Sequence, residues 1–131
     1  MKALDTNILA RYLRDDDPVQ SKRAAQFIQR AVRQGEQLYL NHIVLCELVW
    51  ALTSVYEHRK GEIIRMLESR LLTGHSDLED KASVESALGD YKNCNADFPD
   101  CLIGRRNRKL GCEATLSFDR RLKSLPTFEV V

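Results

Sequence analysis

Apolar residues recur along this chain with two periods, and the changes between the periods predict alternating strands and helices. Short apolar runs predict strands at 2–4, 38–40, 114–117 and 128–131, with a weaker edge strand at 77–79. Apolar residues three and four positions apart predict six helices, at about 8–13, 18–34, 43–56, 61–72, 81–91 and 98–110. This alternation is typical of an α/β fold, in which helices cover both faces of a mainly parallel sheet. No linker or repeat interrupts the pattern, so we expect a single domain over residues 1–131.

Two of the expected helices carry recognisable end signals. Asp17 is expected to be the N-cap of the second helix, with Pro18 at its first position and Gln20 as the partner in a capping box. Gly35 is expected to end the same helix. Asp80 is expected to cap the fifth helix.

A polar triplet, Asp5-Thr6-Asn7, stands where the first strand changes into the first helix. The carboxyl ends of parallel strands are the edge where ligands bind in open α/β sheets. An alternative is that Asp5 or Thr6 only caps the first helix. The triplet alone leaves both interpretations open.

Glu47 occupies an unusual position in the third expected helix. It lies three residues after Val44 and four before Ala51, within an apolar stripe that also contains Leu48 and Val55. An unpaired buried carboxylate costs several kcal/mol, on the order expected for an isolated charge, so Glu47 needs a cation or another partner. A buried salt bridge is the alternative to a functional site.

Three more carboxylates accompany the last helix and the strand after it. Asp97 and Asp100 begin the sixth helix, where caps and the helix dipole also favour negative charge. Asp100 precedes Ile103 by three residues, so it tends toward the buried face. Asp119 directly follows the strand at 114–117 and therefore lies at the same sheet edge as Asp5.

Composition narrows the possible chemistry. The chain is 44% hydrophobic and 30% charged, as in soluble globular proteins, and no apolar run approaches the roughly 20 residues of a membrane span. No signal peptide precedes Asp5, so we expect a cytoplasmic protein without a membrane partner. The four cysteines form no C-x-x-C pair and are expected to be reduced. The three histidines are scattered, which leaves little for a zinc site or a Ser-His-Asp triad.

The formal net charge of +1 hides an asymmetry along the chain. From Cys101 onward there are seven Lys or Arg residues against three acidic ones, whereas the first hundred residues carry a net negative charge. This basic third could contact phosphates, although for Arg105 to Lys109 alone a solvated helix face is the preferred explanation. The candidate contacts with RNA are Arg105, Arg106, Arg120 and Arg121.

Four carboxylates, Asp5, Glu47, Asp100 and Asp119, could converge in one cleft of such a sheet. Like charges in proximity repel, so the cluster is reasonable only around a cation. Oxygen ligands without nearby His or Cys favour Mg²⁺ or Mn²⁺. These ions also bind phosphate oxygens, which indicates phosphoryl or phosphodiester chemistry.

Taken in order, four short motifs resemble a PIN-domain ribonuclease, and the length resembles the VapC toxins of toxin–antitoxin pairs. The motifs are Leu4-Asp5-Thr6-Asn7, Glu47 on a mid-chain helix, Asp97-Phe98-Pro99-Asp100 and Leu116-Ser117-Phe118-Asp119. The resemblance implies a three-layer α/β/α fold with a central five-stranded sheet. By motif it implies a core acidic triad of Asp5, Glu47 and Asp100, with Asp119 as the fourth acidic position.

The resemblance also implies supporting residues and partners. Asn7 would hold the cluster by hydrogen bonds, Ser117 replaces the threonine common in the family, and Asp97 is an additional carboxylate that is either a cap or an outer ligand. The implied activity is Mg²⁺- or Mn²⁺-dependent RNA cleavage by a metal-activated water. The implied partners are an RNA substrate, a co-encoded antitoxin and a second copy of the chain.

Two other functions remain open on the sequence. One is a phosphoryl-transfer domain with Asp5 as the nucleophile. The other is a non-catalytic PIN-like module that only binds RNA or protein. Transfer of phosphate onto Asp5 would establish the first, and the absence of metal-dependent cleavage would favour the second.

Overall fold

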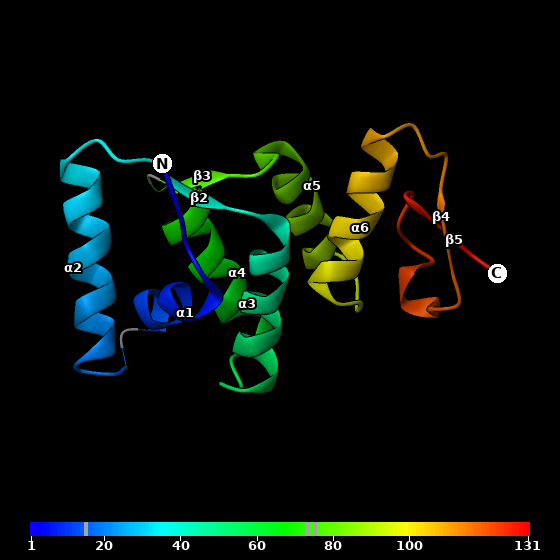
Figure 1. The fold of residues 1–131 in the computed structure, drawn as a ribbon. Coiled ribbons are helices and arrows are strands. Elements are labelled where there is room, and N and C mark those ends of the chain that lie inside the picture. Colours follow the sequence, from blue (N-terminus) through cyan, green and yellow to red (C-terminus); the bar gives the residue numbers. More distant parts are fainter. Residues whose placement is uncertain (15, 73, 75) are drawn as a thin grey trace. The chain divides into compact units, whose positions relative to one another are not determined.

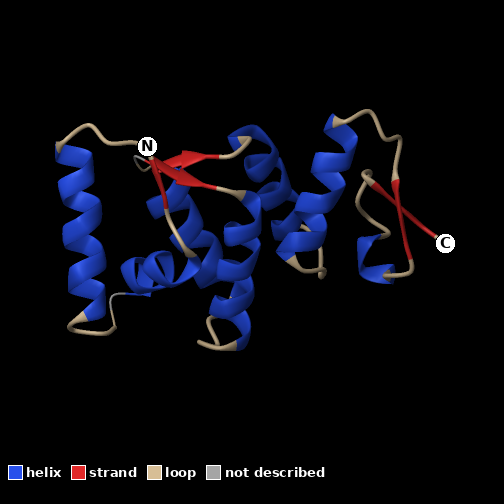
Figure 2. Cartoon of the chain, in the orientation of Figure 1, coloured by secondary structure: helices blue, strands red, loops and turns tan. Residues whose placement is uncertain are grey.

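The computed structural model describes residues 1–14, 16–72, 74 and 76–131. The chain forms two compact units, Met1–Glu79 and Asp80–Val131, called unit 1 and unit 2 below. Figure 1 follows both units in sequence colours, and Figure 2 separates their helices from their strands. Among the described helices, none combines the length and apolar character needed to cross a membrane.

Unit 1 contains a small parallel sheet with four helices around it (Figures 1 and 2). Its elements are β1 (Lys2–Ala3), α1 (Thr6–Arg14), α2 (Gln20–Arg33), β2 (Leu38–Leu40), α3 (His42–Ser54), α4 (Lys60–Met66) and β3 (Ser76–Leu78). The sheet order is β1-β2-β3, and all pairs are parallel. The central strand is the most buried, since Leu38 and Leu40 are almost inaccessible to solvent.

Helix α2 begins and ends through hydrogen bonds that the sequence largely predicted. Asp17 Oδ1 accepts from the backbone N–H groups of Val19 and Gln20, at 3.0 and 2.8 Å. The helix starts two residues later than expected, and Ser21 takes the place of Gln20 in the reciprocal bond, accepting from the Asp17 N–H. At the other end, Gly35 has φ +71° and completes a Schellman motif through the Glu36 N–H bond to the Ala31 carbonyl.

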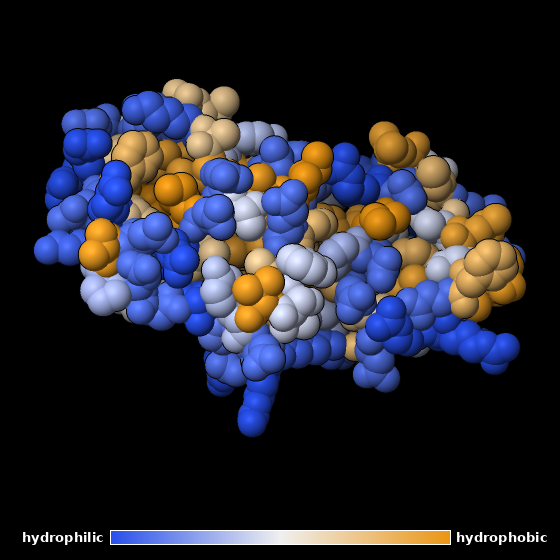
Figure 3. All heavy atoms as spheres, turned by 60° about the horizontal axis from the view of Figure 1, so that its bottom comes forward, coloured by the Kyte–Doolittle hydropathy of each residue, from blue (hydrophilic) through white to orange (hydrophobic). Residues whose placement is uncertain are grey.

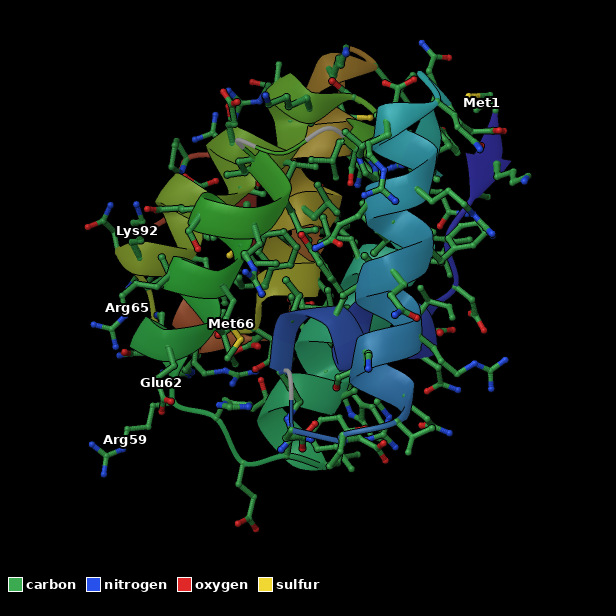
Figure 4. The ribbon with its side chains drawn as sticks, turned by 90° about the vertical axis from the view of Figure 1, so that its left-hand side faces the viewer. Met1, Arg59, Glu62, Arg65, Met66 and Lys92 are labelled. Carbon is green, nitrogen blue, oxygen red and sulfur yellow. The ribbon has the colours of Figure 1, made fainter. Side chains whose placement is uncertain are left out.

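The fourth helix changes its winding partway along. Regular α-helix ends at Met66, and a π-helical turn continues over Leu67–Leu72. Ile63, Leu67 and Leu71 keep the expected apolar side buried through this change. Figure 4 shows Arg59 and Glu62 together at the beginning of α4, where the Arg59 N–H donates to Glu62 Oε1.

Unit 2 contains two helices, a second parallel strand pair and a short 3₁₀ turn. Its elements are α5 (Lys81–Lys92), α6 (Phe98–Lys109), β4 (Thr115–Ser117), the turn Arg120–Leu122 and β5 (Phe128–Val130). Asp80 caps α5 as expected, because its carboxylate accepts from the Ser83 N–H and hydroxyl. The buried faces of α5 and α6 pack together, with Tyr91 and Phe98 in edge-to-face contact at 5.8 Å between ring centroids.

A close approach of backbone and side chains holds α6 against β5. A Cβ atom at Gly104 would lie 2.5 Å from the Phe128 ring and 2.6 Å from the Thr127 hydroxyl. Only glycine fits at this point of the helix. The ring of Phe128 therefore rests directly on the α6 backbone.

The types and order of the elements agree with the sequence prediction, but the sheet pairing is only partly as expected. The ladders of the described residues join three strands in unit 1 and two in unit 2, whereas the sequence suggested one five-stranded sheet. Each strand is two or three residues long. Few backbone hydrogen bonds therefore specify which strands pair.

Candidate functional site

The expected site residues fall into two groups, one in each unit. In unit 1, Asp5 follows β1 after the buried Leu4, and its side chain is exposed. Asp5 Oδ1 accepts from the Thr6 N–H at 2.8 Å, and the Asp5 carbonyl accepts from the Leu9 N–H at 3.3 Å. One carboxylate oxygen thus helps to begin α1. Capping and a functional role are therefore compatible at this residue.

Glu47 is linked to the same triplet through a side-chain hydrogen bond. The Thr6 hydroxyl donates to Glu47 Oε2 at 2.8 Å. This contact joins the end of β1 to the middle of α3 across 41 positions of sequence. Thr6 therefore contacts both predicted acidic residues, Asp5 through its backbone N–H and Glu47 through its hydroxyl.

The predicted burial of Glu47 is wrong. The buried face of α3 includes Leu45, Leu48, Val49 and Leu52. The sequence interpretation placed the buried face on the neighbouring stripe that contains Val44, Ala51 and Val55. Val44 and Ala51 are only half-buried, Val55 is 58% exposed, and Glu47 is exposed. Glu47 therefore needs no buried salt bridge, because water and Thr6 already solvate its carboxylate.

In unit 2 three carboxylates lie around the start of α6 and the end of β4. Asp97 occupies the N-cap position of α6, but its side chain makes no capping hydrogen bond and is 72% exposed. Asp100 is half-buried in the first helical turn. Burial, followed by the charges of Asp97 and Asp119, raises the pKa of Asp100 above its ordinary value. Burial is the largest cause, and repulsion from the two neighbouring carboxylates adds to it.

Arg121 is the counter-charge of this cluster. Its guanidinium forms a bidentate pair with Asp119, with Nη2 2.7 Å from Oδ2 and Nε 3.0 Å from Oδ1, and lies 3.9 Å from Asp97. These hydrogen bonds lower the pKa of Asp119. The Ser117 hydroxyl accepts from the Asp119 N–H at 3.0 Å and fixes the turn after β4. Ser117 therefore holds the backbone of Asp119, and its supporting role in a functional site stays a prediction.

The chemistry of these groups fits a hard divalent cation. All candidate ligands are carboxylate oxygens, and Asp100 carries the raised pKa that a nearby cation would reverse. Within the described parts of the chain, however, no three His, Cys, Asp or Glu side chains are close enough to hold a metal ion.

The structure distinguishes among the predicted basic contacts. Arg105 forms a bidentate ion pair with the buried Asp90, with both N–O distances at 2.7 Å. Arg121 is engaged with Asp119. Arg120 is exposed, and no ion pair of its side chain occurs among the described residues. A role in RNA binding stays a prediction for these residues and for Arg106.

Two features were missed in the sequence. Thr6 was considered only as a cap, yet its hydroxyl orients Glu47. The expected hydrogen bonds of Asn7 are absent from the described residues, and its exposed side chain instead lines a groove between α1 and α2. A signal for this groove was present, because α2 contains four basic residues and no acidic one.

Comparison with known proteins agrees with the arrangement of these motifs. The sequence matches the PIN domain over residues 2–127. The chain belongs to the PIN-domain family. It is also 30% identical, over 125 residues, to a VapC ribonuclease from Aquifex aeolicus (strain VF5). That match covers 95% of this chain and 92% of the relative, and it confirms the predicted resemblance to VapC-type PIN toxins. No solved structure gave a match.

Proposed function

We propose that this PIN-domain protein is a divalent-metal-dependent endoribonuclease and the toxin of a toxin–antitoxin pair. The observation that carries the proposal is the Thr6–Glu47 hydrogen bond, which brings a mid-chain glutamate to the strand end that bears Asp5. The family match and the similarity to a VapC ribonuclease support the same activity. The substrate is RNA, and the bond that is broken is a phosphodiester.

The proposed metal ligands are Asp5, Glu47, Asp100 and Asp119, two from each unit. The central five-stranded sheet expected from the sequence belongs to this proposal as well. Mg²⁺ or Mn²⁺ bound by these ligands would lower the pKa of a coordinated water and stabilise charge on the phosphate. Asp97 is too weakly held to be given more than a supporting role.

The chain's own side chains prepare this site. Thr6 fixes one oxygen of Glu47, which leaves the other oxygen available for a ligand. Ser117 holds the backbone of Asp119 at the end of β4. Arg121 offsets the charge of Asp97 and Asp119, and its guanidinium is suited to a phosphate oxygen once RNA approaches. These residues orient the carboxylates and the substrate.

The partners follow from the same proposal. A co-encoded antitoxin would hold the nuclease inactive in the cytoplasm. A homodimer is supported by two apolar side chains on α3, Ile43 and Trp50, which are 72% and 62% exposed. Such side chains are typical of protein interfaces.

Expression and cleavage experiments with one carboxamide series test the function. Expression of the wild-type chain should arrest bacterial growth, and the purified protein should cut RNA, stop in EDTA and recover with Mn²⁺. Asp5→Asn and Glu47→Gln should each lower the cleavage rate at least about 100-fold, the loss typical of removing a catalytic electrostatic group. Glu85→Gln, a change of an exposed glutamate on α5, is the matched control and should retain full activity.

The alternatives give different results. Cleavage that persists in EDTA would contradict the metal requirement. Phosphate transferred from a small donor onto Asp5 would establish a phosphoryl-transfer domain. RNA binding without cleavage in Mn²⁺ would indicate a non-catalytic module.

A further inference from the structure

A basic groove lies between α1 and α2, on the side of unit 1 that also carries Asn7. Its volume is about 720 Å³, and its charged and aromatic lining consists of Arg11, Arg23, Phe27 and Arg30. Figure 3 shows mostly hydrophilic side chains over α1 and α2, with apolar residues in separate spots. The volume is in the range of sites that bind small molecules or a few nucleotides.

Two of the three arginines that line this groove are exposed to solvent. Arg23 and Arg30 are exposed, and neither forms an ion pair among the residues that the structure describes. Arg11 lies 3.9 Å from Asp16, at the outer limit of an ion pair. The groove therefore presents guanidinium groups to solvent along two turns of α2, about 10 Å from Arg23 to Arg30.

Two of the four cations on α2 are placed against the helix dipole. Lys22 and Arg23 stand in its first turns, where the helix dipole favours negative charge and disfavours cations. Arg30 and Arg33 are three residues apart and repel each other weakly. Arg30 and Arg33 stand in the last turn, where the dipole favours cations, so only Lys22 and Arg23 oppose it. A bound anion would offset the charge of those two residues.

Phe27 adds an aromatic surface between Arg23 and Arg30. Its ring is half-buried, with Arg30 at 5.9 Å and Lys2 at 5.5 Å from the ring centroid. A basic groove with an aromatic ring between its cations is the arrangement that binds single-stranded nucleic acid. Phosphates lie along the charges there, and a base stacks on the ring. An acidic peptide would use the charges but has no base to stack.

We propose that the α1–α2 groove binds the single-stranded RNA segment next to the phosphodiester that is cut. The proposal rests on the proposed ribonuclease function. Asn7 connects the two regions, because it lines the groove and follows Asp5 by two residues. In this proposal the RNA strand extends from the phosphate at Asp5 past Asn7 into the groove. Phosphates contact Arg23 and Arg30, and one base stacks on Phe27.

Binding to an uncleaved RNA tests this path. The Asp5→Asn protein in EDTA is titrated with a fluorescein-labelled 12-nucleotide oligouridine at several salt concentrations, and fluorescence anisotropy gives the affinity. Added to this background, Arg23→Ala and Arg30→Ala should each reduce the slope of log affinity against log salt by about 0.7. The same term corresponds to about a fourfold loss of affinity at 0.15 M salt. Phe27→Ala should weaken binding about fivefold or more without changing the slope.

Arg33→Ala is the matched control, because it removes an equal charge from the same helix outside the groove. Circular dichroism verifies that every variant is folded. If Phe27→Ala is unfolded, Phe27→Leu replaces it, because leucine keeps an apolar side chain but removes the aromatic ring. If Arg23→Ala and Arg30→Ala bind like Arg33→Ala, the proposed path is wrong. If an oligoglutamate peptide of equal charge binds more tightly than oligouridine, the groove is a peptide site and the proposal is overturned.

The experiments distinguish a wrong groove proposal from a wrong ribonuclease proposal. A wild-type protein that cuts RNA in Mn²⁺ while groove variants bind normally contradicts only the groove. A groove that binds RNA in a protein without cleavage activity contradicts only the enzyme.

Discussion

Helices α2 and α6 each carry four basic residues, but the two helices use them differently. On α6, Arg105 pairs with Asp90, Lys109 pairs with Asp80, and Arg108 donates to the Pro126 carbonyl. On α2, Arg23 and Arg30 make no ion pair within the described chain. The sequence interpretation assigned RNA contacts to the basic C-terminal third. The structure shows that part of this charge instead joins α6 to α5.

The difference shows what a charge count cannot measure. A window of sequence gives the number of cations but not their partners. Asp90 and Asp80 lie 15 and 29 positions before their partners Arg105 and Lys109, outside any helical spacing rule. For α2 the informative feature was local, because no acidic residue stands three or four positions from Arg23 or Arg30.

The largest expected effect comes from breaking the pair between Arg105 and Asp90. Arg105→Ala leaves a carboxylate that is only 8% exposed without its partner, which should cost about 3 kcal/mol or more. Asp90→Ala should cost less, about 1–2 kcal/mol, because the Arg105 side chain is 32% exposed and can reach water. Chemical denaturation of both variants measures the asymmetry.

Arg23→Ala is the control for the same substitution on α2 and should leave stability almost unchanged. If Arg105→Ala folds as stably as wild type and lowers only the salt dependence of RNA binding, Arg105 is a phosphate contact. The contrast drawn between the cations of α2 and those of α6 would then be wrong.

A smaller effect is expected at Asp80, and it depends on pH. Hydrogen bonds from Lys109 and then Ser83 lower the pKa of Asp80 from 3.8 to about 2. Since the folded-state pKa is the lower one, the carboxylate stabilises the fold above the unfolded pKa, and this contribution is lost as pH falls toward 2. Asp80→Asn keeps the capping oxygen and tolerates the left-handed backbone at φ +40°.

Asp80→Asn should therefore lower the free energy of unfolding by about 0.5–1 kcal/mol at pH 6, a modest figure because the Lys109 side chain is 62% exposed. The difference from wild type should shrink as pH decreases from 4 to 2. Denaturation curves across this range measure it. A difference that stays constant with pH would show that the cap, and not the charge, is what the substitution changes.

Much of the fold could be predicted because its signals are local. Strand-to-helix changes at Asp5, the glycine after α2 and the aspartate before α5 each act within a few residues, and the structure confirms all three. The pairing of strands could not be predicted with the same success. It depends on long-range ladders between strands of two or three residues, which carry little register information.

For the candidate site, the motifs proposed which residues matter but did not predict how they are held. The link between the Asp5 strand end and Glu47 was expected, but it is made through Thr6 and at the surface. The burial of Glu47 was misjudged because helical periodicity allows two adjacent faces of α3, and only packing selects Leu45 and Val49 over Val44 and Ala51. Whether all four carboxylates hold one metal stays a prediction.

The smallest expected effect tests α2 itself through two arginines at its opposite ends. Arg23 lies near the N-terminus of the helix, so its charge opposes the dipole, whereas Arg33 lies in the last turn, where a cation is favourable. Arg23→Ala should therefore raise the free energy of unfolding by about 0.3 kcal/mol, and Arg33→Ala should lower it by a similar amount. Alanine and arginine have similar helix propensities, so the substitution itself adds little. Both changes should fade in 1 M salt, where the Debye length is about 3 Å.

Thermal melts of the two variants at low and high salt measure these shifts. A loss of more than about 1 kcal/mol in Arg23→Ala would mean that Arg23 has a structural partner like those on α6. An arginine that costs stability on α2 and yet strengthens RNA binding is one that the fold alone does not explain.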